Sequence, residues 1–110
     1  IGWIHRGLVD VAQAYGFLKS KSYDYFSKSF NFAFSKLEKE IKKHPVIISI
    51  YKNFNPQNGG GHLCVLSDIK NKNKFIIFDP DARQRKKVIR KIKLSIFKRG
   101  WKKRFIVIKF

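Results

Sequence analysis

The chain has 110 residues, 44% of them hydrophobic and 15% aromatic, which suits one folded domain and excludes a disordered chain. Its 25 basic and 7 acidic residues give a net charge of +18, which favours binding to nucleic acid, anionic membranes or acidic partners. An AT-rich coding sequence would give the same Lys-rich composition without selection for binding. The single cysteine excludes an internal disulfide and a cysteine-rich zinc site, and no apolar run reaches the roughly 18 residues of a membrane span.

The first elements along the chain are predicted to be a helix and a connector. Apolar residues recur at spacings of three and four over residues 3–15, which predicts an amphipathic helix. Gly16 is placed to end this helix in a left-handed conformation. Residues 17–30 are rich in Ser, Lys and Tyr without sustained periodicity, so we predict a loop that holds at most a short strand near its end.

A second helix is predicted from Phe32 to Lys43. The apolar side chains that share its core face are Phe34, Leu37 and Ile41. Two N-terminal caps fit the sequence: Asn31 alone, or Ser35 together with Glu38 in a capping box. Pro45 ends the helix because it has no N–H to donate and disfavours helical geometry in the residue before it.

Three strands are predicted in the middle of the chain. Val46–Tyr51 carries β-branched residues on both faces, which is typical of a central, covered strand. After a polar loop, His62–Ile69 and Lys74–Phe78 form two adjacent strands. The turn between them, Asn71–Asn73, is rich in Asn, which tolerates positive φ. These two strands are therefore expected to pair as an antiparallel hairpin.

The last elements are predicted to be a strand over Lys87–Ile92, a short helix capped by Ser95 that holds Trp101, and a final strand over Arg104–Phe110. Helices followed by several strands indicate an α+β fold with an antiparallel sheet. No repeat or linker divides the chain, so we expect one domain over residues 1–110.

The hairpin is predicted to bring a histidine close to a carboxylate. His62 begins one strand and Asp79 follows the next, so the two ends lie side by side. Gly59–Gly61 leaves the imidazole uncrowded, and Pro80 holds Asp79 in an extended conformation. A carboxylate bonded to imidazole is half of a catalytic triad. The structural alternatives are a packing histidine and an ordinary strand-ending turn, and Asp81 is a second candidate carboxylate.

Cys64 is a poor candidate for the missing nucleophile. It follows His62 on the same strand, where parallel side chains do not aim the sulfur at the ring, and reactive cysteines usually lie at helix N-termini. We expect it to be a small buried hydrophobe. A metal site built from His62, Cys64 and Asp79 shows no recognised ligand spacing, so no metal or other cofactor is predicted.

The C-terminal third is strongly basic. Residues 82–110 hold 13 Lys or Arg and no acidic residue. Three aromatic residues among them, Phe97, Trp101 and Phe105, could stack on bases in a nucleic-acid complex. The favoured interpretation is that the aromatics face the core while the basic side chains lie in solvent.

Four segments, in order, resemble C39-like cysteine peptidases: Gly2–Phe17, Lys42–Ile50, Gly60–Leu66 and Phe78–Asp81. The first resembles the helix after the catalytic helix, the second a helix-to-strand segment, and the last two the His and Asp-Pro motifs. The later Ser95, Phe97 and Trp101, followed by Phe105–Ile108, resemble the closing helix and strand of the family.

This resemblance implies a papain-like fold in which His62 is the general base and Asp79 orients it. The family's nucleophilic Cys begins an N-terminal helix shortly after a Gln that lines the oxyanion hole, whereas Gln13 and Cys64 lie elsewhere. The resemblance therefore implies either a chain truncated before Ile1 or a divergent, inactive member. The chain as it stands is not expected to hydrolyse peptides.

The partners implied by the resemblance are peptide or protein substrates, since relatives include leader-peptide-cleaving domains of bacterial peptide exporters. The alternatives are an inactive peptidase-fold binding module and a basic nucleic-acid-binding domain, the latter disfavoured. No targeting signal is visible, so the location stays open with the cytoplasm favoured. A missing helix would leave an apolar face of the sheet exposed.

Overall fold

The computed structural model describes residues 9, 13–14, 16, 19–58, 60–79 and 89–108. The helix predicted over residues 3–15 thus lies mostly outside the described residues, although Val9 and Gln13 are helical. Gly16 has a φ of 99°, the left-handed conformation predicted for it, and its N–H donates to the carbonyl of Gln13 at 3.1 Å.

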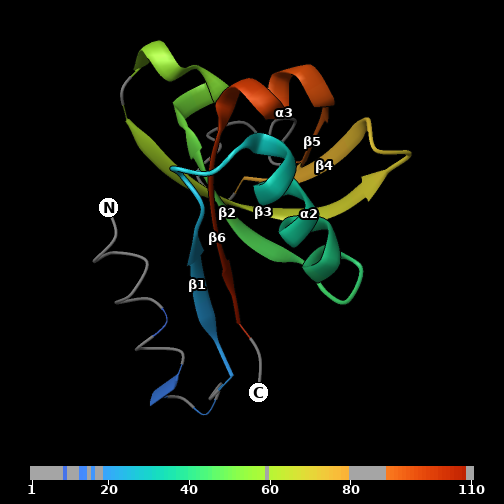
Figure 1. Ribbon diagram of the computed structural model, residues 1–110. Helices are drawn as coiled ribbons and strands as arrows, with labels where there is room; N and C mark the ends of the chain where they lie inside the picture. Colours follow the sequence, from blue (N-terminus) through green and yellow to red (C-terminus); the bar gives the residue numbers. More distant parts are fainter. Residues whose placement is uncertain are drawn as a thin grey trace.

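The fold is α+β, as the sequence predicts, with a six-stranded antiparallel sheet in the order β1-β6-β2-β3-β4-β5 (Figure 1). The elements are β1 (Lys21–Asp24), α2 (Phe30–Ile41), β2 (Val46–Tyr51), the 3-10 turns η1 (Lys52–Phe54) and η2 (Pro56–Asn58), β3 (Gly61–Lys70), β4 (Lys74–Phe78), β5 (Ile89–Lys93), α3 (Leu94–Gly100) and β6 (Trp101–Val107). The last strand, β6, lies between β1 and β2, so the sheet depends on pairing between strands that are far apart in the sequence.

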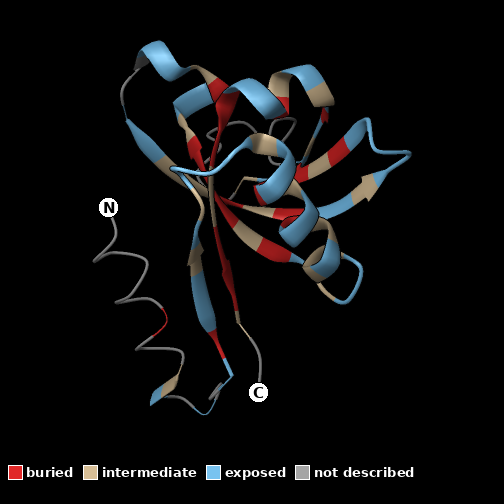
Figure 2. Ribbon diagram, viewed as in Figure 1, coloured by how far each residue is buried: buried red, intermediate tan, exposed pale blue. Residues whose placement is uncertain are grey.

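Both described α-helices cover the same face of the sheet. Phe34 of α2 and Phe97 of α3 contact Phe75 of β4, with ring centroids 5.9 and 4.2 Å apart respectively. Phe97 and Phe75 are fully buried. Buried positions alternate with more exposed ones along β4 and run along β6, as Figure 2 shows in red. The core therefore lies between this face and the two helices.

Two predicted strands have the observed bounds, Val46–Tyr51 and Lys74–Phe78. The strand predicted to begin at His62 is one residue longer at each end. In the turn between β3 and β4, Asn71 and Lys72 have φ values of 55° and 56°, which confirms the positive φ expected of Asn71.

The caps predicted for α2 are wrong. The helix begins at Phe30, and the Ser29 hydroxyl accepts a hydrogen bond from the Phe32 N–H at 3.2 Å. Asn31 lies within the first turn, and Ser35 lies inside the helix with its hydroxyl donating to the Phe32 carbonyl at 2.7 Å. No acidic residue lies three positions after Ser29, so the observed cap does not have the capping-box pattern. Ser35 and Glu38 match that pattern in sequence but do not cap the helix.

The prediction for residues 17–30 is corrected by β1, which forms at Lys21–Asp24 rather than near the end of the connector. Its pairing with β6 places Tyr23 opposite Phe105, and these two rings stack with centroids 4.8 Å apart. The strand is thus fixed by a partner about 80 residues away and not by its own weak pattern.

The prediction for the C-terminal elements is also corrected. The helix begins at Leu94, one residue before the predicted Ser95 cap, and Trp101 begins β6 instead of belonging to the helix. Gly100 is the last residue of the helix, and a Cβ there would lie 2.3 Å from the Phe54 Cα. Only glycine allows this close approach between α3 and η1.

Candidate functional site

His62 and Asp79 lie at the same end of the β3–β4 hairpin. His62 is the second residue of β3, and Asp79 follows the last residue of β4. Val65 faces Phe78 in the antiparallel register, so the next pair sets Cys64 opposite Asp79. His62 is then the diagonal neighbour of Asp79 on one face of the sheet, within reach of a direct contact.

The two side chains are joined by a hydrogen bond. His62 Nε2 lies 2.8 Å from Asp79 Oδ1, and the side chains are 20% and 18% exposed. A carboxylate only accepts, so Nε2 carries the proton and Nδ1 has the lone pair of a base. Among the described residues, nothing is hydrogen bonded to Nδ1. The arrangement can therefore take up a proton at Nδ1 while the carboxylate stabilises the resulting imidazolium.

The residues beside His62 on its face of the sheet, toward β2 and β6, are apolar and buried. Ile50 faces His62 across β2 and β3, and Trp101 faces Ile50 across β2 and β6. Ile50 and Trp101 are 2% and 3% exposed. Buried apolar neighbours lower the local dielectric constant, which strengthens the hydrogen bond between His62 and Asp79.

Cys64 lies beside the dyad but is not reactive. It faces Ile48 of β2 and is 2% exposed. Burial raises the pKa of the Cys64 thiol from 9.0 to about 12, the Asp79 carboxylate adds to the rise, and the Arg90 guanidinium opposes it. The thiol is therefore protonated at neutral pH and packs as a small hydrophobe.

Alkylation rates should show that Cys64 is far less reactive in the folded chain than in the unfolded chain. A pKa of about 12 in place of 9.0 makes the thiolate fraction at pH 8 about 1,000-fold smaller than in an unfolded chain. We expect iodoacetamide to label Cys64 within minutes in 6 M guanidinium, and hardly at all in the folded chain over the same period. The rate in the folded chain should rise as the pH approaches 12. Rapid labelling of the folded chain at pH 8 would contradict the assignment.

Gln13 and Asp81, the other polar residues singled out in the sequence, are not part of the described dyad. Gln13 donates from Nε2 to the Ser20 carbonyl at 3.0 Å, which is a structural role. Asp81 lies outside the described residues, as do Gly59 and Pro80.

The aromatic residues of the basic C-terminal third face the core. Phe97, Trp101 and Phe105 are 0%, 3% and 1% exposed. They are thus unavailable to stack on bases, which removes the stacking part of the case for nucleic acid and leaves only the basic charge.

Arg90 lies near the dyad, although in the sequence it stands out only as part of the basic C-terminal third. It faces Ile77 across β4 and β5, and its guanidinium carbon lies 5.7 Å from the centre of the buried Phe54 ring. The signal in the sequence was its alternation with Ile92, which is 8% exposed and turned to the core.

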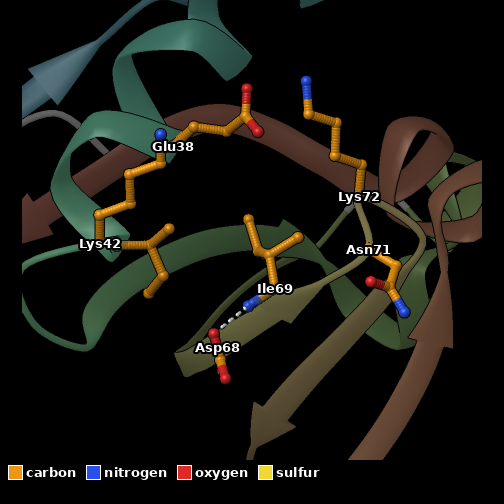
Figure 3. Close-up of a pocket in the computed structure, with 7 residues that line it drawn as sticks. Glu38, Lys42, Asp68, Ile69, Asn71 and Lys72 are labelled. Atoms are coloured by element: carbon orange, nitrogen blue, oxygen red, sulfur yellow. Dashed lines mark hydrogen bonds between the residues drawn. The ribbon is translucent and has the colours of Figure 1, made fainter.

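A separate groove lies at the other end of β3 (Figure 3), with a volume of about 280 Å³. Its lining combines acidic and basic side chains around two isoleucines: Glu38, Ile41, Lys42, Asp68, Ile69, Asn71 and Lys72. Ile69 lies seven positions after His62 along β3, a span of roughly 20 Å. The groove is therefore not part of the dyad.

Within the described ranges, no group of three or more His, Cys, Asp or Glu side chains is placed to hold a metal ion. No helix in the same part of the chain is long and apolar enough to cross a bilayer.

Comparison with known proteins identifies one relationship. Residues 2–105 match the model of the Peptidase_C39 like family. Searches of curated proteins and of solved structures give no match. The match covers nearly the whole chain, including both residues of the dyad.

Proposed function

The chain belongs to the Peptidase_C39 like family, and from this premise we propose that it is a cysteine peptidase-like domain with a papain-like fold that carries the base half of a Cys-His-Asp triad. The observation that carries the proposal is the 2.8 Å bond between His62 Nε2 and Asp79 Oδ1. The bond leaves Nδ1 as the basic nitrogen, on the side of the ring away from the carboxylate.

The proposed reaction is acyl transfer followed by hydrolysis. His62 Nδ1 accepts the proton of a cysteine thiol, and the thiolate sulfur forms a bond to the carbonyl carbon of the scissile peptide. The C–N bond then breaks, and the imidazolium returns the proton to the leaving amine. Water, deprotonated by His62 in the same way, releases the acyl group as a carboxylic acid. Asp79 holds the ring throughout and stabilises its positive charge.

The nucleophile in this proposal does not come from Cys64. That thiol is buried and protonated, and it is the only cysteine among the 110 residues. We therefore place the reactive cysteine on polypeptide outside these residues. In the family pattern a Gln near that cysteine lines the oxyanion hole, which would supply the donor that the dyad lacks.

The substrate in this proposal is a peptide or protein. The family match supports that class.

A labelling experiment tests the proposal. The protein expressed from its complete reading frame is treated with a peptide that ends in a thiol-directed electrophile, and the adduct is mapped by mass spectrometry. We expect one adduct, on a cysteine outside residues 1–110, with loss of peptide hydrolysis. The variant Cys64→Ser is the control and should behave in the same way. An adduct on Cys64 would refute the proposed nucleophile, and the absence of adduct and hydrolysis would favour the inactive binding module.

A further inference from the structure

Arg90 occupies a position in β5 where the alternation of the strand calls for an apolar side chain. Its neighbours on the same strand, Lys91 and Lys93, are exposed, whereas Arg90 is half-buried and Ile92 is buried. Arg90 and Ile92 therefore point to the face of the sheet that carries the dyad and the two helices. Burying a charge on this face costs desolvation free energy unless the charge is paired or hydrogen bonded.

The register places this charge next to the dyad. Phe78 faces Ile89, so Asp79 is the diagonal neighbour of Arg90 on adjacent strands. The guanidinium carbon lies 5.7 Å from the Phe54 ring centre, which is a cation–π contact. Arg90 also lowers the pKa of the Cys64 thiol, which places its charge within electrostatic range of the residue opposite Asp79.

Within the described part of the chain, the N–H donors of this guanidinium have no hydrogen-bond acceptor. Among the described residues, Arg90 has neither a hydrogen bond nor an ion pair, and its one specific contact is with the Phe54 ring. Asp79 Oδ1 is bonded to His62 instead. The guanidinium has no carboxylate partner among the described residues, and its planar fork of N–H donors matches a carboxylate in a bidentate geometry.

We propose that Arg90 binds a carboxylate of the peptide beside the dyad and is a specificity-determining residue of the site. The inference rests on the proposed peptidase function for the identity of its ligand. The carboxylate can be an acidic side chain or the C-terminal carboxylate of the peptide, since both present the same pair of oxygens to the fork. A purely structural arginine would need only the contact with Phe54.

Binding to the 110-residue chain tests this inference without the need for a nucleophile. Three peptides of one uncharged sequence serve as probes: one with a C-terminal amide, one with an internal Glu and an amide, and one with a free C-terminal carboxylate. Isothermal titration calorimetry gives the affinities, and ¹H–¹⁵N spectra show whether the backbone amides of His62 and Asp79 shift. We expect at least one carboxylate peptide to bind about 10-fold tighter than the amide. The peptide that gains affinity identifies the source of the carboxylate.

Three variants separate recognition from the general positive charge of the chain. Arg90→Met should remove the preference for the carboxylate, while Lys91→Met, which removes one charge from the opposite face of the same strand, should retain it. Arg90→Lys keeps the charge without the fork and should lose most of the preference. Circular dichroism and thermal unfolding verify that each variant is folded. If Arg90→Met does not fold, Arg90→Lys alone tests the role of the guanidinium.

The inference is overturned if the three peptides bind the wild-type chain equally, if Lys91→Met lowers the preference as much as Arg90→Met, or if Arg90→Lys retains it in full. Failure of the peptidase proposal gives a different result. In that case the complete protein shows no adduct and no hydrolysis, whereas the binding preference and its dependence on Arg90 persist.

Discussion

Replacing His62 with alanine should lower kcat/KM for peptide hydrolysis by the complete protein at least about 1,000-fold. The change removes the only group in the described site that can accept the thiol proton at Nδ1 and return it to the leaving amine. Asp79→Ala should give a smaller loss, because the imidazole remains but its tautomer and orientation are no longer fixed. Asp79→Asn should lose less again, since the amide oxygen still accepts from Nε2–H. Initial rates with a fluorogenic peptide measure all three.

The chain offers a matched control in its second histidine–carboxylate pair. His44 Nε2 lies 3.2 Å from Glu40 Oε2 at the end of α2, which resembles the dyad in distance but not in place. His44→Ala should leave the rate unchanged. Equal losses in His44→Ala and His62→Ala would contradict a catalytic role for His62 and point to a shared effect on folding.

Replacing Phe97 with alanine should lower the free energy of unfolding by about 3–5 kcal/mol. Its ring is fully buried and stacks on Phe75 and Trp101, with centroids 4.2 and 5.2 Å apart, so its loss leaves a cavity between α3 and the sheet. Domains of this size have a total stability of about 5–15 kcal/mol, so the variant should be close to unfolding at 37 °C.

Urea denaturation followed by circular dichroism measures this change, with Phe26→Ala as the control. Phe26 is 46% exposed and makes cation–π contacts with Lys103 and Arg104 at the surface. Its replacement should cost at most about 1 kcal/mol. Similar losses in the two variants would show that the aromatic cluster beneath α3 does not dominate the core.

The hairpin could be predicted from the sequence because its determinants are local. The three-residue turn between β3 and β4 fixes which residues of the two strands face each other. That register places a residue near the start of β3 beside the residue after β4. The proximity of His62 and Asp79 is therefore a consequence of two short apolar runs and the Asn-rich turn between them.

The ends of the helices were harder to predict because the sequence patterns that mark a helix terminus are weak or ambiguous here. Ser29 caps α2 without an acidic partner three residues later, and a better-matching pattern at Ser35 has no capping role. The last residue of α3 is Gly100 because the Phe54 backbone lies against it and leaves no room for a Cβ, a contact between residues 46 positions apart in the chain. Propensity alone cannot report such a contact.

The sequence by itself determined the α+β class, the central strand Val46–Tyr51 and the pairing of His62 with Asp79, since each follows from residues that are neighbours or joined by a tight turn. Only the tertiary structure decided that β6 begins at Trp101, that β1 forms at all, and that Arg90 faces the dyad. Each of these depends on strands that are distant in the sequence. The interactions that stabilise these strands form only when the sheet is assembled, so no local sequence pattern reports them.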